Sequence, residues 1–426
     1  MTTLKAVRGT RDLLPPETAL WNRIEATARA VFARYNFGEI RTPVFEDTAL
    51  FARSVGEETD IVSKEMYTWE DRARAQSEKT QSLTLRPENT AGVVRAYIEH
   101  QLGETGQLQK LYYIGPQFRR ERPQKGRYRQ FSQIGAEVIG PPSAGSESPL
   151  RDAEVLEMLA TMLDELGING WTLNLNSVGS QADRARYNET LRAALVPVVS
   201  QMCEDCQRRA VTNPLRVLDC KVPADQPIID TLPVIADSLD EESKKHFAAV
   251  LAALDAAGVP YTRNHRLVRG LDYYTRTTFE FTHGGLGAQN ALLGGGRYDG
   301  LSEMLGGPRA PGIGFAMGED RLVLTLLSQE SAPPQVADAF VAPLGDGMNA
   351  AALALARELR RAGLRVELGD GSFRLKKSFE AADKTARAIV ILGEDELQSG
   401  ILTVKTFATG IQSKVPRTEL AVFLNQ

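Results

Sequence analysis

The chain has 426 residues, of which 42% are hydrophobic and 24% are charged, and its formal net charge is −4. This composition is that of a globular protein, and the length exceeds that of a usual single domain, so we expect two or three domains. The acidic balance excludes a uniformly basic surface. Any contact with nucleic acid must therefore come from local basic patches.

The sequence contains no apolar run long enough to span a bilayer. Its start, MTTLKAVRGTRDLLPPE, lacks the apolar centre of a signal peptide. We therefore expect a cytoplasmic protein with no membrane partner.

The N-terminal segment RGTRDLLPPE is interpreted as an ordered loop before a helix. Apolar residues then repeat at helical spacing from Leu20 to Tyr35, and Gly38 is predicted to end this helix. The next segment, EIRTPVFE, has the pattern of a short strand. Because Pro43 removes a backbone donor, we expect this strand to lie at an edge or to bend there.

The segment SLTLRPENT (82–90) combines a strand pattern with the start of a predicted helix. Polar residues at such a transition often face a ligand, which makes Glu88 and Thr90 candidates for a binding site. Glu88 fits equally well as a carboxylate that stabilises the N-terminus of the helix. The sequence leaves both interpretations open.

The most informative stretch is FRRERPQKGRYRQFSQIGAE (118–137), which holds six basic residues. It predicts a hairpin in which one strand ends at Arg119, a basic loop follows, and a second strand carries Gln133 and Glu137 on one face. Arginine beside carboxylate and amide groups suits a ligand with phosphate at one end and amine or ring nitrogens at the other. A solvated loop is the alternative, but Phe131 could stack on a base.

The region from about 183 to 264 has mostly helical patterns and is interpreted as an insertion in a β-rich domain. It contains the three cysteines of the chain, of which Cys203 and Cys206 form a CxxC and Cys220 follows. A four-ligand zinc site would need a further ligand, and there is no second CxxC. Reduced thiols are therefore the favoured interpretation, and no metal site is predicted.

Two later segments also suggest a ligand. In LVRGLDYYT (267–275), Arg269 precedes Tyr273 and Tyr274, which suits either a turn that faces a ligand or a pair of core aromatics. In PGIGFAMGEDRL (311–322), a strand pattern leads into a helix that begins near Gly318. Arg321 lies in the first turn of that helix, where a cation is poorly placed, so we expect it to face an anion or a base.

The segment SQESAPPQ (328–335) has the composition of a linker. The remaining residues, 336–426, alternate strand and helix patterns. This alternation predicts a small α/β domain with a mixed sheet.

Taken in order, the segments RGTRD, TLRPENTAG, FRRERPQKGRYRQFSQIGAE, RGLDYYT and GIGFAMGEDRL resemble histidyl-tRNA synthetases of the bacterial type. The resemblance covers essentially the whole chain. It implies an α+β fold with a class II synthetase catalytic domain at 1–327, in which an antiparallel sheet is flanked by helices and carries the helical insertion. It also implies an anticodon-binding α/β domain at 336–426 and a homodimer built around the helix before Gly38 and the strand at Pro43.

The activity implied by the resemblance is that of a histidine–tRNA ligase, which activates L-histidine with ATP to histidyl-adenylate and transfers it to tRNA(His). Mg²⁺ is expected to accompany ATP. Arg119 and Arg269 are implied as the catalytic groups. Histidine binding is implied for Glu88, Thr90, Arg119, Gln133, Glu137, Arg269, Tyr273 and Tyr274. ATP binding is implied for Arg119, Arg127, Phe131 and Arg321.

The alternative is the non-catalytic regulatory paralogue of ATP phosphoribosyltransferase, which shares the synthetase core. That paralogue usually lacks the C-terminal domain and has a degraded RGLDYYT, whereas both are intact here. The chain departs from the family pattern at Arg120, where some relatives have histidine, at Asn89, where many have glycine, and at Asp320, where glutamate is usual. None of these positions belongs to the implied site.

Overall fold

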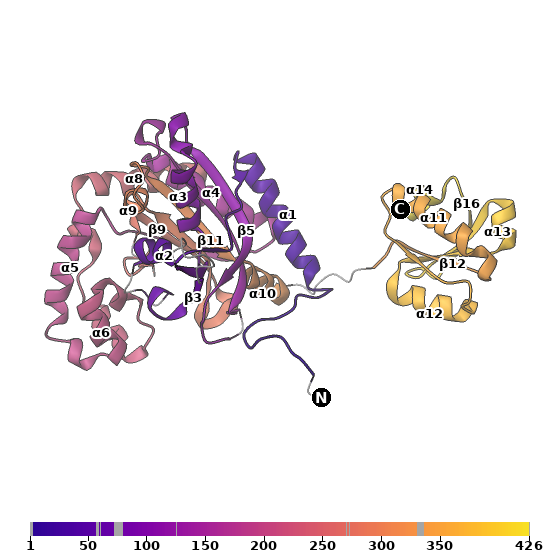
Figure 1. Cartoon of the computed structure of the whole chain (residues 1–426), viewed down its shortest axis with the longest axis horizontal. Helices are drawn as coiled ribbons and strands as arrows, with labels where there is room; N and C mark the ends of the chain where they lie inside the picture. The colour runs from indigo at the N-terminus through magenta and orange to yellow at the C-terminus, as the bar shows by residue number, and fades with distance from the viewer. Residues whose placement is uncertain are drawn as a thin grey trace. The chain divides into compact units, whose positions relative to one another are not determined.

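The computed structural model describes residues 3–56, 59, 61–71, 80–124, 126–269, 271, 273–329 and 336–425. The chain divides into two compact units, Met1–Ser331 and Ala332–Gln426 (Figure 1). Most of the predicted linker, 330–335, lies outside the described residues. Among the helices that are described, none is long and apolar enough to cross a membrane.

The first unit is built on an eight-stranded sheet with the order β1-β5-β6-β11-β10-β9-β7-β8. The strands are β1 (Gly38–Glu39), β5 (Gln109–Phe118), β6 (Gln130–Ile139), β11 (Gly312–Gly318), β10 (Ala291–Arg297), β9 (Thr275–His283), β7 (Trp171–Ser177) and β8 (Thr262–Arg263). The six inner strands pair antiparallel, and only the short outer strands pair parallel. The predicted antiparallel sheet is confirmed.

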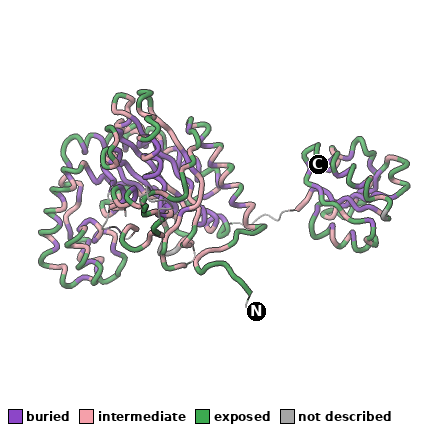
Figure 2. The backbone as a smooth tube through the Cα atoms, viewed as in Figure 1, coloured by how far each residue is buried: buried purple, intermediate pink, exposed green. Residues whose placement is uncertain are grey.

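Helices pack on this sheet, and their apolar faces form the hydrophobic core of the unit with it. They include α1 (Thr18–Arg34), α4 (Pro149–Glu165), α8 (Glu241–Ala257) and α10 (Glu319–Gln329). The apolar face of α1 is fully buried, and the ring of Phe32 stacks on Tyr112 of β5 at 4.5 Å. Figure 2 shows that the buried residues run through the centre of the unit, whereas the exposed ones lie along its outer loops and helices.

The first helix ends earlier than predicted. The pattern placed its end at Gly38, but α1 ends at Arg34. Asn36 takes up the left-handed conformation, with φ of 61°. Asparagine tolerates this conformation better than most residues, so the chain leaves the helix before it reaches the glycine.

A second, three-stranded antiparallel sheet lies before the hairpin, with the order β2-β4-β3. It consists of β2 (Phe45–Asp47), β4 (Gln81–Leu85) and β3 (Tyr67–Asp71), and the helix α2 (Thr48–Val55) follows β2. The break between β1 and β2 contains Pro43, which confirms the predicted interruption. From β4 the chain passes through four residues into α3 (Thr90–Glu99), as the pattern predicted.

The predicted hairpin is present. Strands β5 and β6 pair along their whole length, from Gln109 opposite Ile139 to Phe118 opposite Gln130. The basic residues therefore occupy the loop between them. Gly126 in this loop has φ of 75°, a conformation that favours glycine.

Between β7 and β8 the chain forms the expected helical segment. It contains α5 (Gln181–Leu195), α6 (Glu204–Thr212), α7 (Gln226–Ile229) and α8, joined by short 3₁₀ turns. An apolar cluster of its own, which includes Tyr187, Leu191 and Leu218, holds this segment together.

The second unit contains a five-stranded mixed sheet with the order β13-β12-β14-β15-β16, as the alternation predicted. Its strands are β12 (Ala339–Pro343), β13 (Val366–Leu368), β14 (Ala388–Leu392), β15 (Ile401–Thr406) and β16 (Gln412–Pro416), and its helices are α11 (Asn349–Arg361), α12 (Leu375–Thr385), α13 (Glu394–Ser399) and α14 (Leu420–Leu424). Strand β12 is buried on both faces, with Val341 in one apolar cluster and Phe340 in another.

Candidate active site

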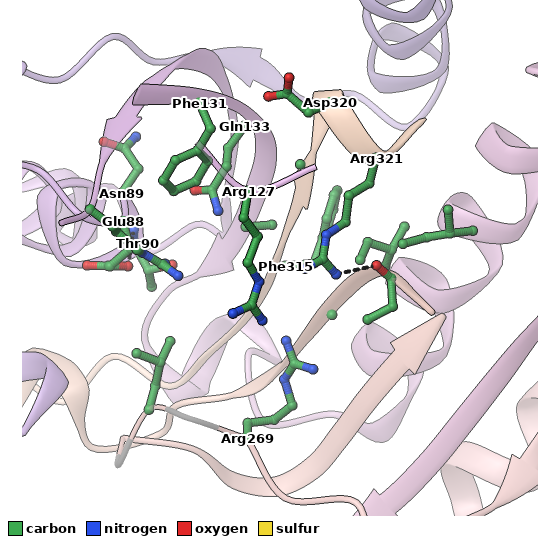
Figure 3. Close-up of a pocket in the computed structure, with 18 of the residues that line it drawn as sticks. Glu88, Asn89, Thr90, Arg127, Phe131, Gln133, Arg269, Phe315, Asp320 and Arg321 are labelled. Carbon is green, nitrogen blue, oxygen red and sulfur yellow. Dashed lines mark hydrogen bonds between the residues drawn. The ribbon is translucent and has the colours of Figure 1, made fainter. Parts of the chain in front are cut away.

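A cavity of about 220 Å³ opens in the first unit beside strands β6, β10 and β11 and the β5–β6 loop. Most of the residues singled out from the sequence line it. They are Glu88, Thr90, Arg119, Arg127, Phe131, Gln133, Arg269, Tyr273, Tyr274 and Arg321. Segments far apart in the chain therefore converge on one site, and Figure 3 shows several of these side chains together.

Three arginines point into the same space. The guanidinium ends of Arg127, Arg269 and Arg321 approach one another from different elements, as Figure 3 shows. Arg127 comes from the hairpin loop, Arg269 from the segment before β9 and Arg321 from the first turn of α10. Like charges gathered in a partly enclosed cavity repel one another, so the arrangement favours a ligand with several negative charges.

Arg269 is held by a charge partner and by the shape of the sheet. Its Nη1 lies 2.5 Å from the Glu280 carboxylate on β9. Burial acts to lower the pKa of Arg269, but the Glu280 carboxylate outweighs this effect and raises the pKa above the usual value. The guanidinium therefore stays charged in the cavity.

Arg321 has a different environment. Its Nη1 donates a hydrogen bond of 2.6 Å to the backbone oxygen of Ala291, the dashed line in Figure 3. Burial and the nearby charge of Arg127 lower the pKa of Arg321. The predicted position in the first turn of α10 is confirmed.

Arg119 lies against the aromatic ring of the next strand. Its Nε donates to the backbone oxygen of Pro87 at 2.9 Å, and its Cζ lies 5.3 Å from the centre of the Phe131 ring. Arg127, which is more exposed, pairs with Glu121 at 3.1 Å. The hairpin thus presents one anchored and one exposed arginine to the same cavity.

The other end of the cavity carries carboxylate and amide groups. The Glu88 carboxylate accepts hydrogen bonds from the backbone nitrogens of Thr90, at 2.8 Å, and Ala91, at 3.0 Å. It therefore stabilises the N-terminus of α3, one of the two roles that the sequence left open, and it also lines the cavity. Burial raises the pKa of Glu88, against the opposing effect of these hydrogen bonds and of Arg119.

Gln133 presents an unused acceptor. Its Oε1 is buried and has no hydrogen-bond partner within the described parts of the chain. Buried amide oxygens are rarely left without a donor. Because Gln133 lines the cavity, this oxygen is placed to accept a hydrogen bond from a ligand.

Glu137 is behind the cavity wall and not among the residues that line it. It is fully buried on β6, where its Oε1 accepts hydrogen bonds from the hydroxyls of Thr90, at 2.7 Å, and Tyr113, at 3.3 Å, and its Oε2 accepts one from Tyr298 at 2.7 Å. Burial raises the pKa of Glu137 to about 8. In this structure Glu137 therefore reaches the cavity through Thr90.

The two adjacent tyrosines serve both of the roles that the sequence suggested. The rings of Tyr273 and Tyr274 lie 4.8 Å apart and pack in an apolar cluster with Tyr97 and Tyr298. Both also line the cavity. Burial raises the pKa of Tyr274 to about 12, so its hydroxyl stays protonated and can donate.

Sequence reasoning missed several residues that shape the site. Glu121 and Glu280 are the charge partners of Arg127 and Arg269, and Tyr113 and Tyr298 hold Glu137. The alternation of β9 was visible in TTFEFT and could have placed Glu280 on one face. The tyrosine in GGGRYDG gave no such signal, because its partner is distant in sequence.

Comparisons with known proteins identify the family of the chain. A family model described as histidyl-tRNA synthetase matches residues 9–322, and one described as an anticodon binding domain matches residues 338–426. Histidine–tRNA ligases of Koribacter versatilis and Solibacter usitatus are 73% and 56% identical to the chain; the matches cover 99% of the chain in both cases and 96% and 99% of those proteins. The crystal structure of apo S. aureus histidyl-tRNA synthetase is 38% identical and matches over 100% of both chains with a TM-score of 0.80. The chain belongs to the histidyl-tRNA synthetase family.

Proposed function

We propose that the cavity of the first unit binds ATP and L-histidine side by side and joins them, and that the histidyl group then passes to tRNA(His). The chain is a histidine–tRNA ligase, as are its relatives at 73% and 56% identity over nearly the whole sequence. The observation that supports this use of the cavity most directly is its polarity. Three guanidinium groups converge at one part, while Glu88 and the unused oxygen of Gln133 lie at another.

In the first step a carboxylate oxygen of histidine attacks the α-phosphorus of ATP. A new carboxyl–phosphate bond forms, the bond to the bridging oxygen breaks, and pyrophosphate leaves with that electron pair. Such an in-line displacement depends mainly on positioning and on stabilisation of charge. We assign Arg119 and Arg269 to the α-phosphate, and Arg269 also to the substrate carboxylate, because a guanidinium group is planar and can bind phosphate or carboxylate through two parallel hydrogen bonds.

The remaining ATP contacts follow from the exposed and aromatic groups. Arg127 is the most exposed of the three converging arginines, with 42% of its side chain accessible, and is assigned to the outer phosphates. Phe131 and Arg321 are assigned to the two faces of adenine, an aromatic ring and a planar cation. Mg²⁺ enters as part of the substrate, since it bridges phosphate oxygens in ATP.

The histidine contacts lie at the polar end of the cavity. Glu88, Thr90 and Gln133 are assigned to the α-ammonium group, which has three donors to satisfy. Glu137 and Tyr274 are assigned to the imidazole, with Tyr273 beside it. Glu137 acts here through the Thr90 hydroxyl that it holds. A site built to hydrogen-bond a polar side chain rejects analogues that lack it by roughly 10⁴–10⁵.

We further propose that residues 1–327, which lie within the first unit, form the catalytic domain and that 336–426 binds the anticodon of tRNA(His). The match of an anticodon-binding family model to residues 338–426 supports this assignment. A homodimer formed around α1 and the β1–β2 segment and a cytoplasmic location complete the proposal.

The decisive test is histidine-dependent exchange of pyrophosphate into ATP without tRNA, with the other amino acids as controls. Exchange with histidine alone is the expected result. The Arg269→Ala variant should lose exchange, whereas Arg309→Ala, which removes an exposed arginine paired with Glu147, should keep it. A folded chain that gave no exchange would contradict the proposal and favour the regulatory paralogue, which binding to a phosphoribosyltransferase would then test.

A further inference from the structure

A compact group of potential metal ligands lies in the helical segment between β7 and β8. The Sγ atoms of Cys203, Cys206 and Cys220 and a carboxylate oxygen of Asp225 all lie within 4.8 Å of one another. All three cysteines are free thiols. Among the residues that the structure describes, no other group of three or more histidine, cysteine or acidic side chains gathers in this way.

The spacing of these atoms matches a tetrahedral ion site. Four ligands at about 2.3 Å from a central zinc ion would place two sulfurs roughly 3.8 Å apart. The Sγ atoms of Cys203 and Cys220 are 3.9 Å apart. The Sγ of Cys220 lies 3.3 Å from the Oδ2 of Asp225, close to the separation of about 3.6 Å expected between a sulfur and an oxygen ligand.

The local backbone brings the four ligands together. Cys203 is the residue before α6 and Cys206 lies in its first turn, whereas Cys220 follows the 3₁₀ turn Pro214–Asp219 and Asp225 ends the next one. The backbone nitrogen of Cys203 donates to the Asp225 carboxylate at 3.1 Å, and that of Val222 donates to the Cys220 sulfur at 3.4 Å. Such contacts orient metal ligands and stabilise negative charge on sulfur.

We propose that Cys203, Cys206, Cys220 and Asp225 form a structural zinc site. Thiolate ligands select Zn²⁺ over the oxygen-preferring Mg²⁺ and Ca²⁺. With four protein ligands the tetrahedron is complete, which is the arrangement of a structural site and not of a catalytic one. Cys206, Cys220 and Asp225 are buried and Cys203 is half-buried, so solvent has little access to the ion.

A disulfide does not account for the arrangement. A disulfide requires sulfurs about 2.05 Å apart, far closer than the 3.9 Å between Cys203 and Cys220, and it would leave Cys206 and the carboxylate of Asp225 without a role. Zinc uses all four groups. Binding would release the thiol protons, because each sulfur coordinates as thiolate.

The position of the site links it to the cavity. Val268 packs against the apolar cluster that includes Cys206 and Cys220, and the next residue is Arg269. The zinc ion would therefore stabilise the 3₁₀ turns against which the Arg269 segment packs. Its role in the synthetase is structural support of that segment, at a distance from the reacting atoms.

The test uses the full wild-type chain, reduced and freed of metal with a chelator. It is titrated with Zn²⁺ in the presence of a competing chromophoric chelator, and the bound metal is counted by mass spectrometry. We expect about one zinc ion per chain, and a thiolate-to-metal charge-transfer band when Co²⁺ replaces Zn²⁺. A folded chain that takes no zinc from the competitor and gives no such band would overturn the proposal.

Variants at Asp225 separate a ligand from a hydrogen-bond acceptor. Asparagine keeps an acceptor for the Cys203 backbone but is a poor zinc ligand, so Asp225→Asn should weaken zinc binding about tenfold or more. Asp225→His supplies a good ligand and should bind more tightly than Asp225→Asn. Asp230→Asn, in the same segment and 62% exposed, is the matched control and should bind as wild type does. Equal zinc affinity in the asparagine variant and in wild type would show that Asp225 is not a ligand.

Discussion

The guanidinium group of Arg269 lies so close over Gly294 that a Cβ atom at position 294 would come 2.5 Å from its Cζ. Gly294 is held in β10 by pairing with Glu280 of β9 and Ala316 of β11. The long side chain of Arg269 is therefore the part that must move when position 294 gains a side chain. The missing side chain of Gly294 therefore leaves the space that the Arg269 guanidinium occupies.

Gly294→Ala should consequently displace Arg269 without removing its charge. Because small misplacements of a positioning group can slow a reaction strongly, we expect histidine-dependent pyrophosphate exchange to fall about 10- to 100-fold in kcat, with the melting temperature little changed. Gly318→Ala is the matched control. Gly318 also lines the cavity, but a Cβ atom there has no described neighbour within 4 Å. Equal losses of kcat in both variants would argue against a role for Gly294 in positioning Arg269.

Substitutions at Glu137 and Arg269 should change different kinetic constants. Arg269→Ala removes charge at the reacting phosphate, so kcat should fall by about 10²–10³. Glu137→Ala removes the buried carboxylate assigned to the imidazole, so the KM for histidine should rise and discrimination against other amino acids should fall. Steady-state exchange kinetics with varied histidine and varied ATP measure both effects. Equal weakening of ATP binding and histidine binding in the two variants, with an unchanged turnover rate, would contradict these separate roles.

Glu319 should make stability depend on pH. It is the first residue of α10 and is 1% exposed, and burial raises its pKa from 4.5 to about 8. Between these values the unfolded chain has lost a proton that the folded chain keeps, so the free energy of unfolding falls as pH rises from about 4.5 to about 8.

Glu319→Gln removes this titration. At pH 8 the variant should melt several degrees above wild type, whereas near pH 4.5 the two should melt alike. Glu137 also has a raised pKa, so the stability of the Glu319→Gln variant keeps part of its dependence on pH. Glu104→Gln, at an exposed position in the turn after α3, is the control and should keep the wild-type slope. Parallel melting curves for Glu319→Gln and wild type across this range would contradict the prediction.

A fully buried ion pair supports the core of the first unit. Arg297 and Asp152 are both 0% exposed, and Arg297 Nη1 lies 2.5 Å from the Asp152 carboxylate. Asp152→Ala leaves a buried guanidinium with fewer partners, so we expect a loss of about 3–5 kcal/mol in the free energy of unfolding. Glu147→Ala breaks the exposed pair with Arg309 and should cost less than about 1 kcal/mol.

Urea unfolding followed by tryptophan fluorescence measures this difference. The three tryptophans of the chain, Trp21, Trp69 and Trp171, all belong to the first unit, so the signal reports that unit alone. Comparable losses in the two variants would show that burial does not set the strength of the pair.

Local patterns predicted the parts of the fold that local physics decides. The β5–β6 hairpin follows from alternation around a turn that contains Gly126, and the start of α10 follows from the change of period near Gly318. The same patterns brought two arginines into consideration as ligand contacts. Arg119 lies at the start of a basic loop whose next strand carries amide and carboxylate groups, and Arg321 is a cation in the first turn of a helix. Both line the cavity.

Contacts between distant segments could not be predicted in this way. Glu137 is held by Thr90 and Tyr298, which lie 47 and 161 residues away in the chain. Asp225, 22 residues beyond Cys203, matches no cysteine spacing, so the sequence offered no fourth ligand. In each case burial selects the partner, and burial depends on how strands and turns pack rather than on any repeat.

The pair formed by Arg269 and Glu280 means that Arg269 already has an anionic partner before any substrate arrives. A carboxylate or phosphate that reaches Arg269 has to compete with the Glu280 carboxylate, so binding there is an exchange of one anion for another. Weakly interacting ions such as chloride compete poorly with a carboxylate at such short range. The Glu280 carboxylate thus keeps Arg269 oriented and charged. It also prevents Arg269 from binding ligands that cannot contact the other arginines at the same time.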